Sequence, residues 1–155
     1  MKGPLFLLLL LINIATAGAQ AVTKEMLKGK WEMVFVEFPG MALDLVNKKC
    51  TLSGELADDI TQEYRAMAEE QMMQGVGNME GSLVFDDVLL TSKITQKGET
   101  GIDQGPYEIK ATTPVTLEVV MPQGKMILEI WFKDDNLMLK KHEDQGVFTY
   151  KKVNN

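Results

Sequence analysis

The stretch Leu27–Val34, LKGKWEMV, places a glycine two residues before a tryptophan at the head of an apolar run. Residues 31–38 alternate as a strand does, because successive side chains of a strand point to opposite faces. The larger apolar residues of one face are Trp31, Met33 and Phe35. A Pro-Gly pair at 39–40 ends the strand. Either this pattern marks the first strand of a ligand-binding barrel, or the tryptophan is only a large side chain that fills a hydrophobic core. The rest of the sequence distinguishes these two interpretations.

Downstream of Gly81 the apolar residues recur at every second position in short runs, separated by turn residues such as Lys97-Gly98. The predicted runs are Ser82–Asp86, Val88–Thr95, Pro106–Ala111, Val115–Met121, Lys125–Lys133, Leu137–His142 and Val147–Val153. Short strands at a spacing of about ten residues indicate an all-β sandwich or barrel, and connections this short require antiparallel neighbours. With the first strand, the sequence predicts a mainly β fold of eight antiparallel strands.

One face of the predicted strands is continuously apolar. In Val115–Met121 and in Lys125–Lys133, every second residue is Val, Leu, Ile, Met or Phe, as the interior of a barrel requires. Eight strands close around an interior that is either filled by side chains or holds one small ligand. The alternation therefore predicts a barrel and leaves open whether it is hollow.

Ser53–Gln74 is the one segment with a clear helical period. Its apolar residues form a single stripe, which consists of Leu56, Ile60, Tyr64, Met67, Ala68 and Met72. A helix of about 20 residues is about 30 Å long, as long as a small barrel is tall. We therefore expect one long helix after the first strand, packed across one opening of the barrel as a lid. Residues 41–50, MALDLVNKKC, fit either a short helix or an irregular lid.

The opening stretch and the C-terminal segments carry recurring barrel motifs. Gly29-Lys30-Trp31 is a G-x-W motif at the start of the first strand. The C-terminal segments are 127–132 (ILEIWF), 134–139 (DDNLML) and 146–153 (GVFTYKKV). On these motifs the chain resembles lipocalins and related calycin barrels, in particular small exported bacterial lipocalin-like domains. The resemblance implies an eight-stranded lipocalin-like barrel in which Gly29 and Trp31 are structural, with the tryptophan packed at the closed end.

The helix departs from that family in its position, because typical lipocalins place a helix after the last strand. Fatty-acid-binding proteins insert helices after the first strand, but they have two helices and ten strands and lack a signal peptide. They often carry a basic pair for the ligand carboxylate, and no such pair can be assigned here. Arg65, the only arginine, is on the polar side of the predicted helix. The sequence therefore gives no basis for capture of an acidic ligand.

The N-terminus has the composition of a secretory signal peptide. Lys2 precedes an apolar run from Leu5 to Ile14, and small residues over 15–21 give two A-x-A cleavage sites. We expect residues 1–19 to be removed, with cleavage after 21 as the alternative, and one domain over 22–155. The apolar run is shorter than the roughly 20 residues that cross a bilayer. The mature protein is therefore expected to be exported, periplasmic or secreted, without stable membrane insertion.

Composition excludes several partners. The formal net charge is −6, and it becomes −7 without the leader because Lys2 is the only charged residue there. Such an acidic chain argues against sequence-independent nucleic-acid binding, which depends on basic side chains, and against adsorption to anionic membranes. Cys50 is the only cysteine. It is expected to be a small buried hydrophobe, with a reactive thiol or an intermolecular bridge as the alternatives.

No residue pattern predicts catalysis, a metal site or a cofactor. His142, the only histidine, lies in the charged segment KKHED at 140–144 and is expected to be solvated, so no base accompanies a Ser or Cys nucleophile. Acidic pairs such as Asp58-Asp59 are sequence neighbours and lack the facing geometry of two-carboxylate hydrolysis. The 11 methionines have three possible roles, which are filling the core, lining an adaptable ligand cavity and binding Cu(I). The sequence gives no support for Cu(I) binding, because no His or Cys lies at ligand spacing from a methionine. The chain is therefore not expected to be an enzyme.

The sequence favours an exported binding protein for a small hydrophobic or amphipathic ligand. The expected cavity-lining residues are Met33, Phe35, Phe85, Leu117, Val119, Met126, Leu128 and Ile130 from the strands, with Tyr64 and Met67 from the helix. The alternative is a barrel packed solid that acts through its surface as an interaction or inhibitor module. No protein partner is predicted.

Overall fold

A computed structural model describes residues 21–76, 78–142 and 144–154 of the chain. Its elements, in chain order, are α1 (Lys24–Leu27), β1 (Gly29–Phe38), β2 (Met41–Asp44), β3 (Lys49–Leu52), α2 (Glu55–Asp58), α3 (Gln62–Val76), β4 (Glu80–Phe85), β5 (Leu89–Gln96), β6 (Glu99–Lys110), β7 (Thr116–Met121), β8 (Gly124–Lys133), β9 (Asn136–Lys141) and β10 (Val147–Lys152). The predicted leader at 1–19 lies outside the described residues. Within the described ranges, no helix is long and apolar enough to cross a membrane.

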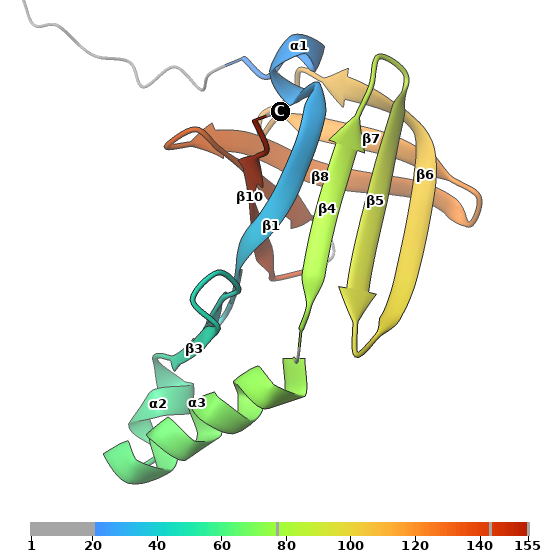
Figure 1. Cartoon of the computed structure of the whole chain (residues 1–155). Coiled ribbons are helices and arrows are strands. Elements are labelled where there is room, and N and C mark those ends of the chain that lie inside the picture. Colours follow the sequence, from blue (N-terminus) through green and yellow to red (C-terminus); the bar gives the residue numbers. More distant parts are fainter. Residues whose placement is uncertain (1–20, 77, 143, 155) are drawn as a thin grey trace, which may run out of the picture.

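Eight strands close into an antiparallel barrel (Figure 1). The ring runs from β1 through β4, β5, β6, β7, β8, β9 and β10, and β10 pairs back with β1. These eight strands correspond to the eight predicted runs, so the antiparallel barrel is confirmed. The first half of β1, Gly29–Glu32, pairs with β4, and its second half, Phe35–Phe38, pairs with β2. The β2–β3 hairpin therefore extends the sheet to ten strands outside the closed ring.

The short helix α1 covers one end of the barrel, and Trp31 fills the space beneath it. The Thr23 side chain caps the helix by accepting a backbone N–H, and Leu27 is fully buried. The indole Nε1 of Trp31 donates to the Leu27 carbonyl at 2.6 Å, and its ring centroid lies 5.8 Å from that of Phe132. The Lys152 ammonium lies over the indole ring at 5.2 Å. Trp31 therefore has the structural role at the closed end that the resemblance implied.

A β-bulge in β1 changes which residues face the interior. Met33 pairs with Tyr150 on β10, but the next cross-strand pair joins Phe35 to Thr149, because one extra residue is inserted between them. Val36, which is fully buried, takes the next inner position. The expected inner face of Trp31, Met33 and Phe35 thus ends at Met33. This corrects the placement of Phe35, which is half-buried on the outer side of the bulged strand.

The segment between β1 and β4 differs most from the sequence prediction. Residues 41–52, which the sequence left open, form the β2–β3 hairpin. The expected single long helix over Ser53–Gln74 is instead divided into α2, which has 4 residues, and α3, which has 15, and the hairpin lies between β1 and both helices. None of the residues of α3 is buried. The helix packs against β3, and Figure 1 shows it beyond the end of the barrel opposite α1, displaced toward the side of β3.

The inner faces of the eight barrel strands form one continuous apolar core. Its most deeply buried side chains are Leu27, Trp31, Val36, Phe85, Leu90, Leu117, Val119, Ile130 and Leu137. All buried residues are apolar or Tyr, and every described buried side-chain nitrogen or oxygen has a hydrogen-bond partner. The core runs from Leu27 beneath α1 to Val36 in the second half of β1, so space for a ligand has to be sought where the inner face of the other strands becomes exposed.

Candidate functional site

The turn of the β5–β6 hairpin lies at the end of the barrel opposite α1 (Figure 1). Its two-residue turn has Lys97 at φ 52° and Gly98 at φ 83°. Positive φ at both central residues defines a type I′ turn, whose twist matches that of the paired strands. The strands pair in register from Leu89 with Pro106 to Gln96 with Glu99. The turn and the register together fix which side chains face inward.

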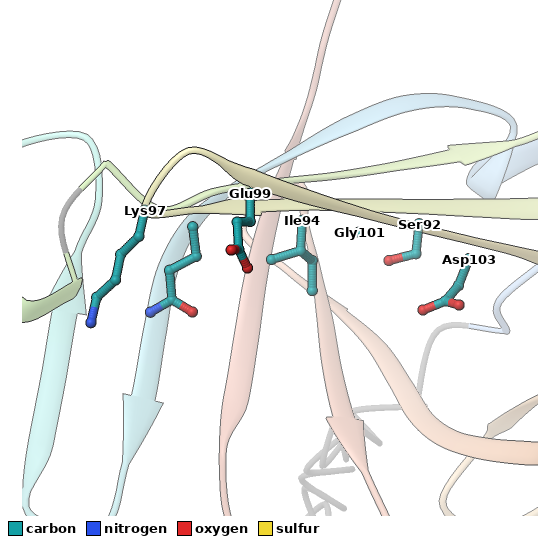
Figure 2. A pocket seen from close by; sticks show the side chains of 7 residues that line it. Ser92, Ile94, Lys97, Glu99, Gly101 and Asp103 are labelled. Carbon is teal, nitrogen blue, oxygen red and sulfur yellow. The ribbon is translucent and has the colours of Figure 1, made fainter.

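The inward-facing side chains of this hairpin change from apolar to polar along its length. On β5, Leu90 is fully buried in the core, whereas Ile94, four residues further along the same face, is 44% exposed. The residues of this outer half line a depression of about 550 Å³, and Figure 2 shows their side chains on one side of the hairpin. They are Ser92, Ile94, Gln96, Lys97, Glu99, Gly101 and Asp103.

A second depression of about 440 Å³ adjoins the first and shares Ser92, Ile94 and Asp103 with it. Its other wall comes from the β7–β8 hairpin and the end of β9. The additional lining residues are Met121, Gln123, Gly124, Lys125, Met126, Ile127, Lys141 and His142. We call the two depressions together the mouth cavity. It lies where the inner surface of the barrel becomes accessible to solvent.

The mouth cavity forms because β6 leaves β7 partway along its length. Only Tyr107–Lys110 of β6 pairs with β7, and the part from Glu99 to Pro106 pairs with β5 alone. Gly105 marks the point of closest approach, where a Cβ atom would overlap the backbone carbonyl of Val120. Across the gap, the side-chain amide of Gln123 donates to Asp103 Oδ1 at 3.4 Å, which is a long contact.

Some of the charged groups around the mouth cavity have an ion-pair partner and others do not. Lys125 makes an ion pair with Glu118 at 2.9 Å, and this contact lowers the pKa of the Glu118 carboxyl. His142 Nδ1 lies 3.7 Å from Glu129. Among the described residues, by contrast, Glu99 and Asp103 make no ion pair, so their carboxylates face the cavity without a basic partner.

Apart from Phe35, which lies on the outer side of the bulged strand, the predicted cavity-lining residues divide into three groups. Six of them belong to the buried core, namely Met33, Phe85, Leu117, Val119, Leu128 and Ile130. Met126 packs against that core and lines the mouth cavity, so it is the one predicted residue at the accessible site. Tyr64 and Met67 are 64% and 50% exposed on α3. The lid interpretation of these two residues is therefore corrected, because α3 turns its other side toward β3.

Sequence reasoning missed Ser92, Ile94 and Asp103, the residues common to both depressions. The segment from Glu99 to Gln104 lacks the apolar alternation of a buried strand and lies outside the predicted runs, yet it continues β6. The available signal was the Lys97-Gly98 turn itself, because a two-residue type I′ turn requires paired strands on both sides.

Among the described residues, no group of three or more His, Cys, Asp or Glu side chains could hold a metal ion.

No family model matches the chain, and no curated protein matches it. Among solved structures, Schistosoma mansoni fatty acid binding protein in complex with arachidonic acid is 10% identical, with 86% of this chain and 100% of that chain covered and a TM-score of 0.38. Caenorhabditis elegans lipid binding protein 8 is 8% identical, with 85% and 99% covered and a TM-score of 0.39. Echinococcus granulosus fatty-acid-binding protein 1 is 14% identical, with 84% and 99% covered and a TM-score of 0.35. Because these scores are low, the fold assignment rests on the sheet topology of the chain itself.

Proposed function

We propose that this protein binds one small amphipathic molecule in the mouth cavity of its barrel. The observation that carries the proposal is the pair of adjoining depressions, which share Ser92, Ile94 and Asp103 on the inner face of the hairpin. Their volumes, about 550 and 440 Å³, fall in the range of small-molecule sites. The site lies at the accessible end because the rest of the interior is filled by side chains.

The two walls of the cavity suit the two parts of an amphipathic molecule. Ile94, Met121 and Met126 offer an apolar surface, and methionine side chains adapt to ligands of different shape. Asp103 and Glu99 offer carboxylate oxygens that accept hydrogen bonds. A ligand whose amine or hydroxyl group lies beside Glu99 and Asp103 fits these walls, whereas a fatty-acid carboxylate at that position would face two like charges and would have to turn toward Lys97 or Lys141 instead.

The expected affinity is modest. A ligand of about 20 non-hydrogen atoms at about 0.3 kcal/mol per atom reaches about 6 kcal/mol, which corresponds to a Kd of roughly tens of micromolar. An open, half-polar site excludes less water than an enclosed apolar one, so tighter binding requires additional polar contacts.

The test compares two fluorophores that share a dansyl group and an alkyl chain but end in an amine or a carboxylate. We expect saturable binding to one site, with the amine form binding more tightly. Ile94→Asn removes apolar surface from the wall without adding a charge that would attract the amine, and it should weaken binding of both fluorophores about ten-fold. Ile102→Asn is the matched control, because Ile102 is 65% exposed on the outer face of the adjacent strand.

Equal effects of the two substitutions would refute the mouth cavity as the site. No saturable binding across a panel of amines, fatty acids, sterols and dyes would refute the binding function. The remaining interpretation would then be the surface interaction module, which the exposed apolar residues Leu56, Tyr64 and Met67 favour.

Export is part of the same proposal and rests on the leader sequence at 1–19. Expression with the leader should yield a mature protein that begins at residue 20 or 22, as N-terminal sequencing of the exported fraction determines. Retention of Met1 on the folded protein would contradict the proposal.

A further inference from the structure

Helix α3 contacts the rest of the molecule along a single row of side chains. Arg65 and Glu69 face β3, and Met73 and Val76, further along the same side, pack against the core. Depressions of about 500 and 530 Å³ lie along the C-terminal and N-terminal halves of this row, and both include Lys49 and Glu69 in their linings. With no residue of α3 buried, little apolar surface holds the helix in place.

The row includes a polar clamp on one backbone position. Glu69 Oε1 accepts the backbone N–H of Leu52 at 2.8 Å, and the Arg65 guanidinium donates to the Leu52 carbonyl. The two side chains are joined to each other by an Arg65 Nε to Glu69 Oε1 contact of 3.1 Å. Leu52 is in the last strand of the ten-stranded sheet, and it pairs with Met41 on its other side.

The clamp takes the place of a neighbouring strand. A residue of an edge strand presents an N–H and a C=O toward solvent, and natural proteins cover such edges because they template pairing with other chains. Here one carboxylate and one guanidinium satisfy both groups of the same residue. Charge-assisted hydrogen bonds of this kind are stronger than neutral ones, so the clamp contributes much of the attachment of α3.

We propose that α3 is a hinged cover of the β3 edge, latched by Arg65 and Glu69, and that it opens without unfolding the barrel. Gly54, at φ 55°, connects β3 to the helical segment, and Gly75, whose added Cβ would meet no atom within 4 Å, lies near its other end. Val76 packs against the core and anchors the C-terminal end. Opening would expose the Leu52 backbone and Cys50, which lines the depression next to Glu69.

Acidification should release the latch. The backbone N–H of Leu52, and then Arg65, hold the pKa of Glu69 below its usual range. The charged or titratable groups facing Glu69 are Arg65 on α3, and Lys49 and Cys50 on β3. A carboxyl with a lowered pKa stabilises the closed form above its ordinary pKa, and this contribution disappears as the pH falls through the pKa of the folded protein.

The test measures two local probes on the full mature chain. Amide hydrogen exchange reports on the Leu52 N–H, and the rate of Cys50 reaction with 4,4′-dithiodipyridine reports on access to the thiol, which is 3% exposed. Each thiol rate is divided by that of urea-unfolded protein at the same pH. Glu69→Gln should accelerate both processes about ten-fold, the factor that about 1.4 kcal/mol produces, and Arg65→Met should do the same.

Glu70→Gln is the matched control, because Glu70 is exposed one residue further along the helix and contacts Gln74. It should leave both rates at the wild-type level. Labelling of the wild type should rise as the pH falls below 5, and that of the Glu69→Gln variant should not. Rates that are equal in Glu69→Gln and Glu70→Gln would overturn the proposal.

The wild type provides a second test that does not depend on any variant folding. If α3 opens alone, the free energy of opening measured by exchange at the Leu52 amide depends only weakly on urea concentration, because little surface is exposed. At core positions such as Leu117, it depends on urea as strongly as global unfolding does. The same strong dependence at both positions would mean that the cover opens only when the barrel unfolds, and would overturn the proposal.

Discussion

Replacement of Trp31 by phenylalanine tests the closed end of the barrel. The change removes the Nε1 donor and leaves the Leu27 carbonyl without its 2.6 Å partner. A hydrogen bond of this kind contributes about 1 kcal/mol. The smaller ring also leaves a cavity against Phe132, at a cost of about 1 kcal/mol, and weakens the contact with the Lys152 ammonium by about 0.5 kcal/mol. We expect Trp31→Phe to lower the free energy of unfolding by about 2–3 kcal/mol.

The assay is urea unfolding followed by far-UV circular dichroism, since the substitution alters the fluorescence signal. Trp131→Phe is the matched control, because Trp131 is half-buried on the outer face of β8, where it pairs with Met138. It should cost less than about 1 kcal/mol. A loss below about 0.5 kcal/mol for Trp31→Phe, or equal losses for the two variants, would refute the role of Trp31 in closing the barrel.

Two further predictions concern the barrel itself. Gly105→Ala should lower the free energy of unfolding by about 1–3 kcal/mol, because the added Cβ would overlap the Val120 carbonyl. Gly101→Ala, on the part of the same strand that pairs only with β5, should leave the stability nearly unchanged. Calorimetry of the two variants tests this difference. Burial raises the pKa of Tyr150 to about 12. Because the unfolded phenol ionises near pH 10, its contribution of about 2–3 kcal/mol is complete below pH 10 and lost as the pH rises toward 12, and ultraviolet difference titration against a Tyr150→Phe variant should detect the loss.

The eight barrel strands could be predicted from the sequence because each carries its own signal. In β7, Leu117, Val119 and Met121 share a face, and the same alternation in β8 places Leu128 opposite Leu117 and Met126 opposite Val119. The cost of exposing such a face to water fixes the register of every pair. The local alternation of apolar and polar residues was therefore sufficient to predict which strand residues form the core.

The bulge in β1 and the orientation of α3 could not be predicted from periodicity. The bulge inserts a single residue, so Phe35 and Val36 exchange faces without any change in composition. On α3, apolar residues lie on two sides, with Tyr64 and Met67 on one and Met73 and Val76 on the other. A hydrophobic stripe indicates a buried face only when the other face is polar.

The contacts that orient α3 and shape the mouth cavity are polar and join distant segments. Glu69 reaches back 17 residues to Leu52, and Gln123 reaches 20 residues to Asp103. A carboxylate or amide has no preferred sequence distance to its partner, so neither contact leaves a periodic trace. Packing also constrains these positions little, because a solvent-exposed polar side chain can be exchanged at a cost of about 0.5 kcal/mol or less. The positions proposed to decide ligand binding in the mouth cavity are therefore those that the fold leaves free to vary, while Trp31 is fixed by the packing that closes the barrel beneath α1.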